Sequence, residues 1–154
     1  MSTAVRFVVR RARTQRELSE ALKLRHDVFC IEQGVPEREE LDGRDHEGIH
    51  LIAVAVEQGD TEAGEVLGAC RLVLVGRTVQ FSRLAVRAFA RRQGIASALL
   101  EAADAETRAA GARRLVLHAQ TYARRLYEQA GYVPRGVPFR EAGIEHIAME
   151  KELA

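Results

Sequence analysis

A basic turn runs into a long helical stretch at Arg91-Arg92-Gln93-Gly94. The first N–H groups of a helix lack partners within the helix, and the helix dipole places partial positive charge beside them. Because the turn carries no Ser, Thr or Asp cap, a bound anion could accept those hydrogen bonds instead. Gly94 would let an anion approach the backbone closely, and the two arginines would donate charge-assisted hydrogen bonds. These residues predict a phosphate-binding site; an ordinary helix start with exposed arginines is the alternative.

Two common classes of nucleotide-binding loop do not fit this chain. A nucleoside-triphosphate loop ends in Gly-Lys followed by Ser or Thr, and a dinucleotide fold opens on Gly-x-Gly-x-x-Gly. Neither pattern occurs in the sequence. Lys and Arg number 23 against 22 Asp and Glu, for a formal net charge of +1. Domains that bind nucleic acid usually carry a strong basic excess, so no nucleic-acid partner is expected.

The elements around the basic turn alternate between strands and helices. Thr14-Gln-Arg-Glu17 has capping-box spacing and opens a helix that is expected to stop at Gly34-Val-Pro36. Further helices are expected at residues 94–108 and 121–130. Strands are expected at residues 5–10, 49–56, 66–75, 79–86, 115–117 and 143–150, with a turn at 58–65. This order predicts a mixed α/β fold with one central sheet.

The length of 154 residues corresponds to a single domain covering residues 1–154. Hydrophobic residues make up 47% of the chain, which is enough for a buried core. Two cysteines, Cys30 and Cys70, are too few for a disulfide framework. No apolar run is long enough for a signal peptide or a membrane span. We therefore expect a cytoplasmic protein with reduced thiols and no membrane partner.

The basic turn resembles the coenzyme-binding motif of a known superfamily. Arg91-x-x-Gly94-x-Ala96 is similar to the Arg/Gln-x-x-Gly-x-Gly/Ala motif of the GNAT N-acetyltransferases. The preceding Arg83-Leu-Ala-Val86 resembles the family's fourth strand, and Leu126-Tyr-Glu-Gln-Ala-Gly131-Tyr resembles its fourth helix. Two further segments suggest the ElaA-type branch of the family: Arg25-x-x-Val-Phe29-x-x-Glu32-Gln33 and Gly143-Ile-x-His146.

This resemblance implies a single-domain GNAT-like α/β fold. Its central sheet would be mixed, mostly antiparallel and built of six to seven strands, with about four flanking helices. The sheet would splay open between the fourth and fifth strands.

The resemblance also implies that acetyl-coenzyme A is the acyl donor. Backbone groups of Leu84 and Val86, on either side of Ala85, would pair with the pantetheine arm like an added strand. The Val86 N–H would polarise the thioester carbonyl. Gln120 stands where the family often has an Asn near the coenzyme. The pyrophosphate would be bound by the N–H groups of Arg92, Gln93, Gly94, Ile95, Ala96 and Ser97.

Acetyl transfer to an amine needs a neutral amine, a polarised carbonyl and a proton for the departing thiolate. A thiol with a pKa of about 8.5 can be reprotonated by a weak acid such as tyrosine. Tyr127 matches the family's usual acid position; a core aromatic on a helical stripe is the alternative. His118, Glu32 and His146 are candidates for the base, and a water chain without a single base stays open. The reaction needs no metal.

Arg25 falls on the same helical face as Leu18, Leu22 and Phe29. A buried guanidinium requires a partner, and Glu40-x-Asp42-x-x-Asp45 follows closely in the sequence. We therefore expect an Arg25–carboxylate contact that orders the substrate-side loop. If some of these acids stay unpaired, they would favour a cationic amine substrate, and Asp42 is a candidate substrate-binding residue.

One motif points to a different chemistry and is discounted. His46-Glu-Gly-Ile-His50 spells the zinc-protease signature H-E-x-x-H, which works only on a helix. Gly48 interrupts the segment and Ile49 begins a predicted strand, so no zinc site is expected. Cys70 is expected in the core. Cys30 could lie near the substrate site, but it has no evident activating partner.

The leading prediction is an acetyl-CoA-dependent N-acetyltransferase that acts on a primary amine of a small molecule or peptide. An acyl-homoserine-lactone synthase is an alternative, because the Arg25 and Glu40 segments resemble that family's N-terminal pattern; the absence of Trp counts against it. A coenzyme-A-binding regulator without turnover is the alternative from another class. Exposed strand edges in such folds would allow a homodimer.

Overall fold

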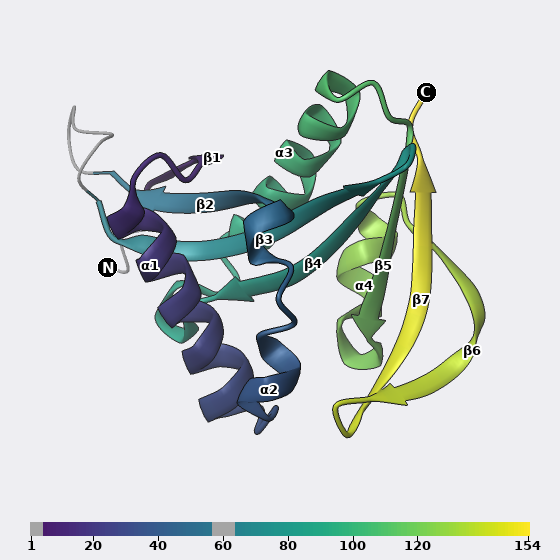
Figure 1. The fold of residues 1–154 in the computed structure, drawn as a ribbon, viewed down its shortest axis with the longest axis horizontal. Helices are drawn as coiled ribbons and strands as arrows, with labels where there is room; N and C mark the ends of the chain where they lie inside the picture. Colours follow the sequence, from purple (N-terminus) through teal and green to yellow (C-terminus); the bar gives the residue numbers. More distant parts are fainter. Residues whose placement is uncertain (1–4, 57–63) are drawn as a thin grey trace.

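The computed structural model describes residues 5–56 and 64–154. A seven-stranded sheet has the order β1-β2-β3-β4-β5-β7-β6 (Figure 1). Neighbouring strands are antiparallel except β4 and β5, which are parallel. The predicted mixed, mostly antiparallel sheet is therefore confirmed. The strands are β1 (Phe7–Arg11), β2 (Ile49–Ala55), β3 (Val66–Val75), β4 (Thr78–Val86), β5 (Arg114–Gln120), β6 (Val133–Glu141) and β7 (Ile144–Glu152).

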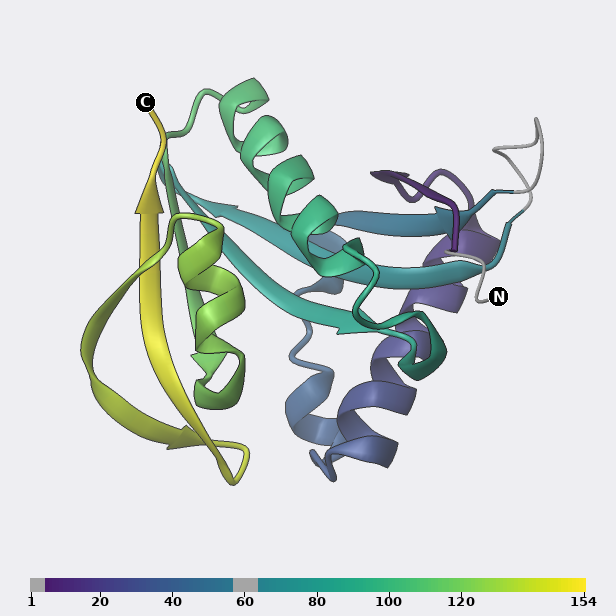
Figure 2. The same cartoon turned by 180° about the vertical axis from the view of Figure 1, so that it is seen from behind.

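Helices cover both faces of this sheet. Helices α1 (Gln15–Arg25) and α2 (Glu37–Glu40) lie on one face, and α3 (Ile95–Ala109) and α4 (Arg124–Gln129) lie on the other (Figures 1 and 2). Within the described ranges, none of the helices is long and apolar enough to cross a membrane.

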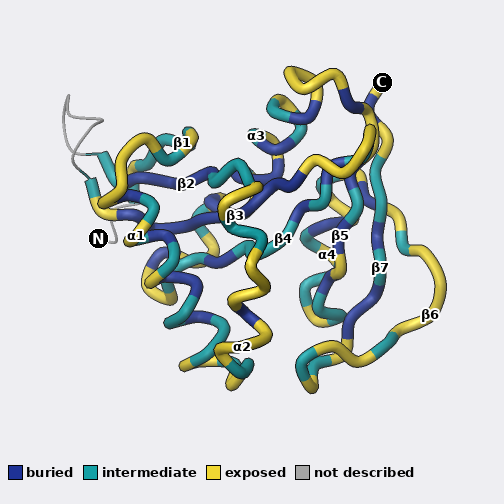
Figure 3. Tube along the Cα trace, in the orientation of Figure 1, coloured by how far each residue is buried: buried dark blue, intermediate teal, exposed yellow. Residues whose placement is uncertain are grey.

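The sequence of β2 explains why the sheet is covered on both sides. Successive side chains of a strand point to opposite faces. Leu51 and Ala53 belong to the core beneath α3, whereas Ile52 and Val54 belong to the core beneath α1. A continuous apolar run is therefore what a two-sided strand needs. Figure 3 shows the central strands as buried and β6 as largely exposed.

Helix α1 begins at the predicted capping box and then changes its winding. Thr14 Oγ1 accepts the Glu17 N–H at 3.1 Å, and the Glu17 carboxylate accepts the Arg13 N–H at 2.7 Å. Beyond Arg25 the chain continues as a π-helix, η1 (His26–Glu32), before Gly34 ends it with a φ of 73°. Over seven residues the apolar pattern does not separate α from π winding, so the sequence predicted one uninterrupted helix.

The sheet opens between β4 and β5, as predicted. Pairing of these two strands is confined to residues 78–80 of β4 and 114–116 of β5. Beyond Gln80 the strands diverge (Figure 1). A residue with positive φ, Arg83 at 60°, lies in β4 just past this point.

Several element boundaries differ from the sequence prediction. Strand β5 is longer than the expected 115–117, and the helix expected at 121–130 starts as a 3-10 turn, η4 (Thr121–Ala123). Strand β6 was not predicted, because Pro134, Gly136 and Pro138 are typical of loops. Proline is tolerated on an edge strand, where its missing N–H costs no sheet hydrogen bond, and β6 is an edge. The turn expected at 58–65 lies largely outside the described residues.

Candidate active site

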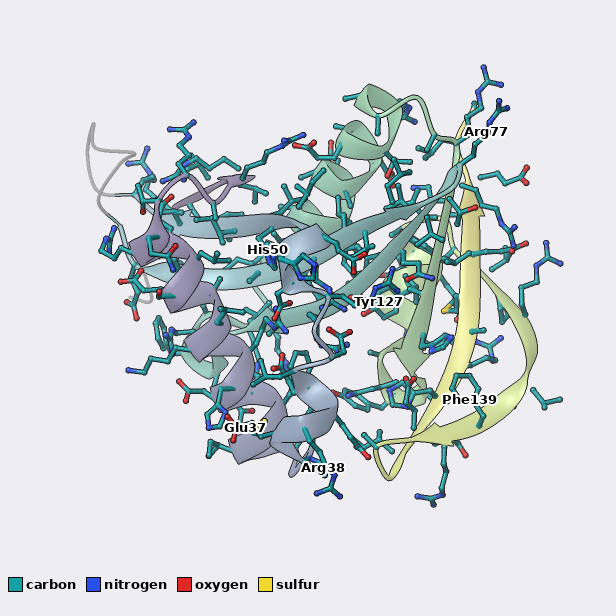
Figure 4. All side chains as sticks on the ribbon, in the orientation of Figure 1. Glu37, Arg38, His50, Arg77, Tyr127 and Phe139 are labelled. Atoms are coloured by element: carbon teal, nitrogen blue, oxygen red, sulfur yellow. The ribbon has the colours of Figure 1, made fainter. Side chains whose placement is uncertain are left out.

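The divergence of β4 and β5 opens a pocket of about 1220 Å³. Figure 4 places Tyr127 in the region where the two strands separate. Two residues of the predicted site, Gln93 and Arg25, do not line this pocket. The predicted site residues that line it are Glu32, Asp42, Leu84, Ala85, Val86, Arg91, Arg92, Gly94, Ile95, Ala96, Ser97, His118, Gln120, Tyr127 and His146.

The end of β4 has an open edge. The Arg87 N–H donates to the Leu67 carbonyl on β3 at 2.9 Å. Backbone groups of adjacent strand residues point in opposite directions, so the N–H and C=O of Val86 point away from β3. Consistent with this, the Val86 carbonyl accepts a hydrogen bond from Arg91 Nε at 3.0 Å rather than from β3. Because β5 has diverged here, Val86 and Leu84, two residues earlier, present backbone groups to the pocket.

The start of α3 presents a second set of backbone donors. Gly94 is the N-cap residue with a φ of 87°, and no side chain of residues 5–56 or 64–154 caps this helix end. Arg92 also has a positive φ, at 62°, which turns the chain sharply into the helix. Gln93 does not cap the helix, because its Oε1 accepts the Val5 N–H at 2.7 Å. The first amides of α3 are therefore available to an anion, as the sequence predicted.

Gly68 sets the distance between α3 and the sheet. A Cβ added at Gly68 would lie 2.7 Å from Ile95 Cγ2 and 3.3 Å from Leu99 Cδ1. Gly68 also pairs with Val86 across the β3–β4 ladder. The absence of a side chain at Gly68 thus brings the backbone donors of the β4 edge close to those at the start of α3. Sequence reasoning missed this residue, although a glycine inside a predicted strand is a signal of close backbone approach.

Arg91 and Glu32 form an ion pair at the pocket. Arg91 Nη2 lies 2.9 Å and 2.8 Å from the two carboxylate oxygens of Glu32. The two side chains are 42% and 41% exposed. Since Glu32 ends the π-helix and Arg91 precedes α3, the pair joins the N-terminal segment to the turn before α3.

Tyr127 is a nearly buried phenol at the back of the pocket, with 8% of its surface exposed. Its ring packs edge-to-face against Phe81 at 6.4 Å and against Tyr132 at 6.1 Å between centroids. Burial raises the pKa of the Tyr127 hydroxyl well above its ordinary value. The hydroxyl is therefore protonated at neutral pH, and it can donate a hydrogen bond or a proton.

Two histidines share one carboxylate on the β5–β7–β6 side of the pocket. Glu141 lies 3.3 Å from His118 Nδ1 and 3.8 Å from His146 Nε2. His146 Nδ1 lies 2.7 Å from the Ile144 carbonyl, which can only accept, so Nδ1 carries the proton. Phe139 packs between the two imidazoles, edge-to-face on His118 and stacked on His146. Glu141 and Phe139 were missed because β6 itself was not predicted.

Gln120 is engaged by the protein. Its Nε2 donates to Gln33 Oε1 at 2.8 Å, and Gln33 Nε2 donates to the Tyr122 hydroxyl at 3.4 Å. These contacts connect the residue after the π-helix with β5 and η4.

Arg25 is a buried anchor beneath the acidic segment rather than a pocket residue. Its guanidinium is 1% exposed, and it donates to Glu40 Oε1 at 2.6 Å and to Asp45 Oδ1 at 2.7 Å. The expected Arg25–carboxylate contact is therefore present. Arg71 on β3 donates to Asp42 at 2.7 Å and to Asp45 at 2.9 Å.

These contacts decide whether Asp42 is free to attract a cationic amine. The role expected from the sequence was conditional on an unpaired carboxylate, but Asp42 is held by Arg71 and by Arg83, whose Nη2 lies 3.2 Å away. The hydrogen bond from Arg71 holds the Asp42 pKa far below its ordinary range. The carboxylate is thus ionised but already neutralised, so it gives no evidence of a cationic substrate.

The sequence of this chain matches a known protein family over most of its length. Residues 26–153 match the model of the acetyltransferase (GNAT) domain. The chain belongs to the GNAT acetyltransferase family. It is 38% identical over 154 residues to the UPF0039 protein Rv2851c of Mycobacterium tuberculosis, covering 97% of this chain and 93% of that one.

Solved GNAT structures share the fold. Escherichia coli ElaA superposes with a TM-score of 0.79 at 20% identity, covering 96% of this chain and all of ElaA. An aminoglycoside 6′-N-acetyltransferase complexed with coenzyme A superposes with a TM-score of 0.71 at 15% identity, covering 94% and 96%. The resemblance to the GNAT superfamily predicted from the sequence is confirmed, and ElaA is among the structures with this fold.

The structure also places the residues that suggested a different chemistry in the sequence. His46 lies in a 3-10 turn, η2 (Asp45–Glu47), and His50 lies on β2, so H-E-x-x-H is not helical, as predicted. Among the described residues, no group of three or more His, Cys, Asp or Glu could hold a metal ion. Cys70 is buried, as expected. Burial and the nearby Glu40 raise the pKa of the Cys30 thiol, which weakens it as a nucleophile.

Proposed function

We propose that this GNAT protein transfers an acetyl group from acetyl-CoA to a primary amine of a small molecule or peptide. One observation carries the proposal: the open edge of β4 at Leu84 and Val86 and the uncapped start of α3 at Gly94 line the same pocket. Acetyl-CoA combines an extended chain rich in amides with a pyrophosphate. The β4 edge suits the amides, and the helix start suits the pyrophosphate.

The pyrophosphate is proposed to accept hydrogen bonds from backbone N–H groups of residues 92–97. Gly94 leaves open space for this approach, since a Cβ there would meet no atom of the described residues within 4 Å. Arg91 and Arg92 add positive charge beside the phosphates. The pantetheine arm is proposed to run along β4 and to pair with backbone groups of Leu84 and Val86.

The reaction is a direct attack of the amine on the thioester. The amine nitrogen forms a bond to the carbonyl carbon, and the oxygen of the resulting tetrahedral intermediate takes the negative charge. The Val86 N–H donates to that oxygen. Collapse of the intermediate breaks the carbon–sulfur bond, which yields an amide and coenzyme A.

Tyr127 is proposed to protonate the departing thiolate. Its raised pKa keeps the proton on the phenol at neutral pH, although it also makes the phenol a weaker acid. A thiolate that leaves within the same buried pocket is likewise more basic than in water. Proton transfer from Tyr127 to the thiolate is therefore proposed to be coupled to loss of a proton from the attacking nitrogen. The total charge of the active site then stays unchanged.

His118 is proposed to accept that proton. The carboxylate of Glu141 can only accept, so the contact at 3.3 Å places hydrogen on His118 Nδ1 and leaves Nε2 unprotonated in the neutral ring. Glu32 is a weaker candidate because Arg91 holds its carboxylate. His146 is largely buried, and its Nε2 faces Glu141 at 3.8 Å.

Release of free thiol from acetyl-CoA in a panel of primary amines tests this function. We expect amine-dependent thiol release with mass spectrometry showing one added acetyl group on the amine. Turnover only with an acylated carrier protein and S-adenosylmethionine would favour the acyl-homoserine-lactone synthase alternative. Saturable coenzyme binding without turnover of any amine would favour a regulator.

A further inference from the structure

Arg83 adopts a backbone conformation that is rare for residues other than glycine. Its φ of 60° lies in the left-handed region, inside β4. The β3–β4 register shows the consequence: Ala69 pairs with Ala85, whereas Arg71 pairs with Ser82. One residue of β3 therefore faces two residues of β4, which defines a β-bulge at residues 83 and 84. Holding a non-glycine residue in this region costs conformational free energy, so surrounding contacts must stabilise it.

The contacts that hold Arg83 come from the end of α2 and from Asp42, just after it. Its Nη2 donates to the Glu40 carbonyl at 3.0 Å and to Asp42 Oδ2 at 3.2 Å, and its Nε donates to the same Glu40 carbonyl at 3.2 Å. Nη2 also lies 3.3 Å from the Glu39 carbonyl. The Arg83 side chain is 22% exposed. The guanidinium is thus fixed by backbone as well as side-chain acceptors.

The same segment is itself anchored to the core. Glu40 is bound by the fully buried Arg25 of α1, and Asp42 is bound by the buried Arg71 of β3. Arg83 therefore connects β4 to a framework that includes α1 and β3. Because these anchors are buried, the partners of Arg83 have little freedom to move.

The bulge lies immediately before the open edge of β4. A change in the backbone torsions of Arg83 would rotate the residues that follow, which include Leu84 and Val86. These are the residues whose backbone groups face the pocket where β5 has diverged. The orientation of the edge thus depends on the conformation of Arg83.

We propose that Arg83, held by Glu40 and Asp42, is a positioning residue that orients the Val86 N–H on the β4 edge toward the thioester carbonyl. The inference rests on the proposed donor site, because the Val86 N–H must point toward the carbonyl of the bound donor. Arg83 acts through the backbone of β4 and takes no part in bond formation. Its loss is expected to impair stabilisation of the tetrahedral intermediate more than binding of the coenzyme.

Arg83→Met tests this role, with Asp45→Asn as the control. Asp45 accepts hydrogen bonds from Arg25 and Arg71 of the same framework, whereas Arg83 donates to Glu39, Glu40 and Asp42 instead. Removing a hydrogen-bond donor to the oxyanion lowers kcat about 10²–10³-fold. A misoriented Val86 N–H is therefore expected to lower kcat about tenfold to hundredfold. Free coenzyme A lacks the acetyl carbonyl but is proposed to pair with the β4 edge through its pantetheine arm, so its Kd is expected to rise only about twofold to fivefold, less than kcat falls.

Hydrogen exchange in the free protein provides a readout that does not depend on activity. We expect amide exchange at residues 84–86 to accelerate about tenfold or more in Arg83→Met. Asp45→Asn is expected to lower the melting temperature while keeping both kcat and this exchange rate near wild type. Arg83→Lys keeps the charge but not the forked geometry, and it provides a milder test if Arg83→Met does not fold.

Unchanged kcat and unchanged exchange at residues 84–86 in the Arg83 variants would overturn the inference. An equal loss of kcat in Asp45→Asn would also overturn it, since the effect would then be general destabilisation. Wild-type protein that binds coenzyme A but turns over no amine would contradict the proposed function. In that case the exchange measurement still decides whether Arg83 positions the edge.

Discussion

Arg91 Nη2 donates to both carboxylate oxygens of Glu32, while Arg91 Nε donates to the Val86 carbonyl. One guanidinium therefore connects the end of the π-helix, the open edge of β4 and the turn before α3. A coenzyme pyrophosphate at that turn would compete with Glu32 for Arg91. If the proposed donor site is correct, the ion pair would oppose binding of the donor.

Glu32→Gln is expected to tighten coenzyme A binding about twofold to fivefold, since exposed ion pairs contribute about 0.2–1 kcal/mol. The measurement is the Kd from isothermal titration calorimetry. Glu128→Gln is the matched control, because Glu128 pairs with Arg124 at similar exposure. Weaker binding by Glu32→Gln would mean that Glu32 supports the donor site rather than competes with it.

Tyr127→Phe is expected to lower kcat about 10²-fold or more, because general acid catalysis contributes about 10²–10⁴-fold. The Kd of coenzyme A and the folding stability should change little, since the ring and its packing remain. Steady-state thiol release and calorimetry measure the two effects.

Tyr132→Phe provides the control for the Tyr127 variant. Its ring packs against Tyr127, and its buried hydroxyl has no hydrogen-bond partner among the described residues. Removing that hydroxyl should leave kcat unchanged and stability unchanged or slightly higher. Equal losses of kcat in both variants would show that the effect comes from packing rather than from proton transfer.

The structural features that are proposed to bind the donor could be predicted from the sequence because they depend on local patterns. The absence of a side-chain cap before Gly94, the basic turn and the apolar strand before it are all visible within a few residues. The same locality made the Arg25–carboxylate contact predictable, since the acids follow Arg25 closely.

The parts of the site that could not be predicted from the sequence depend on interactions between distant segments. Glu141 and Phe139 lie on β6, whose prolines are tolerated only because the strand is an edge, and edge position is a property of the whole sheet. The left-handed Arg83 is stabilised by the segment at residues 39–42, which nothing near Arg83 in the sequence reveals. The pairing of Asp42 with Arg71 likewise joins residues 29 positions apart.

Arg25→Met is expected to destabilise the fold by about 3–5 kcal/mol, because it leaves the buried Glu40 carboxylate without its charge partner. Urea denaturation monitored by circular dichroism gives the free energy of unfolding. Arg16→Met, which removes an exposed i,i+4 pair with Glu20, should cost only about 0.3–0.5 kcal/mol. Similar small costs for both variants would contradict the anchoring role of Arg25.

Glu17 is expected to contribute to acid sensitivity. The hydrogen bond from Arg10 lowers the Glu17 pKa from 4.5 to about 2. Because the folded-state pKa is depressed, the stabilisation is present above pH 4.5 and is lost as pH falls toward 2. Glu17→Gln should cost about 1.5–3 kcal/mol at neutral pH and much less near pH 2. Denaturation at several pH values measures this difference, and a cost independent of pH would contradict it.

An NMR titration of ¹⁵N-labelled protein with acetyl-CoA tests whether this pocket binds the acetyl donor. We expect saturable shifts of the amides of residues 92–97, at the start of α3, and of residues 84–86, along the β4 edge. Amides of β1, at the far edge of the sheet, should not shift. Shifts confined to another surface, or no saturable shifts at these two segments, would contradict the assignment of this pocket to the acetyl donor.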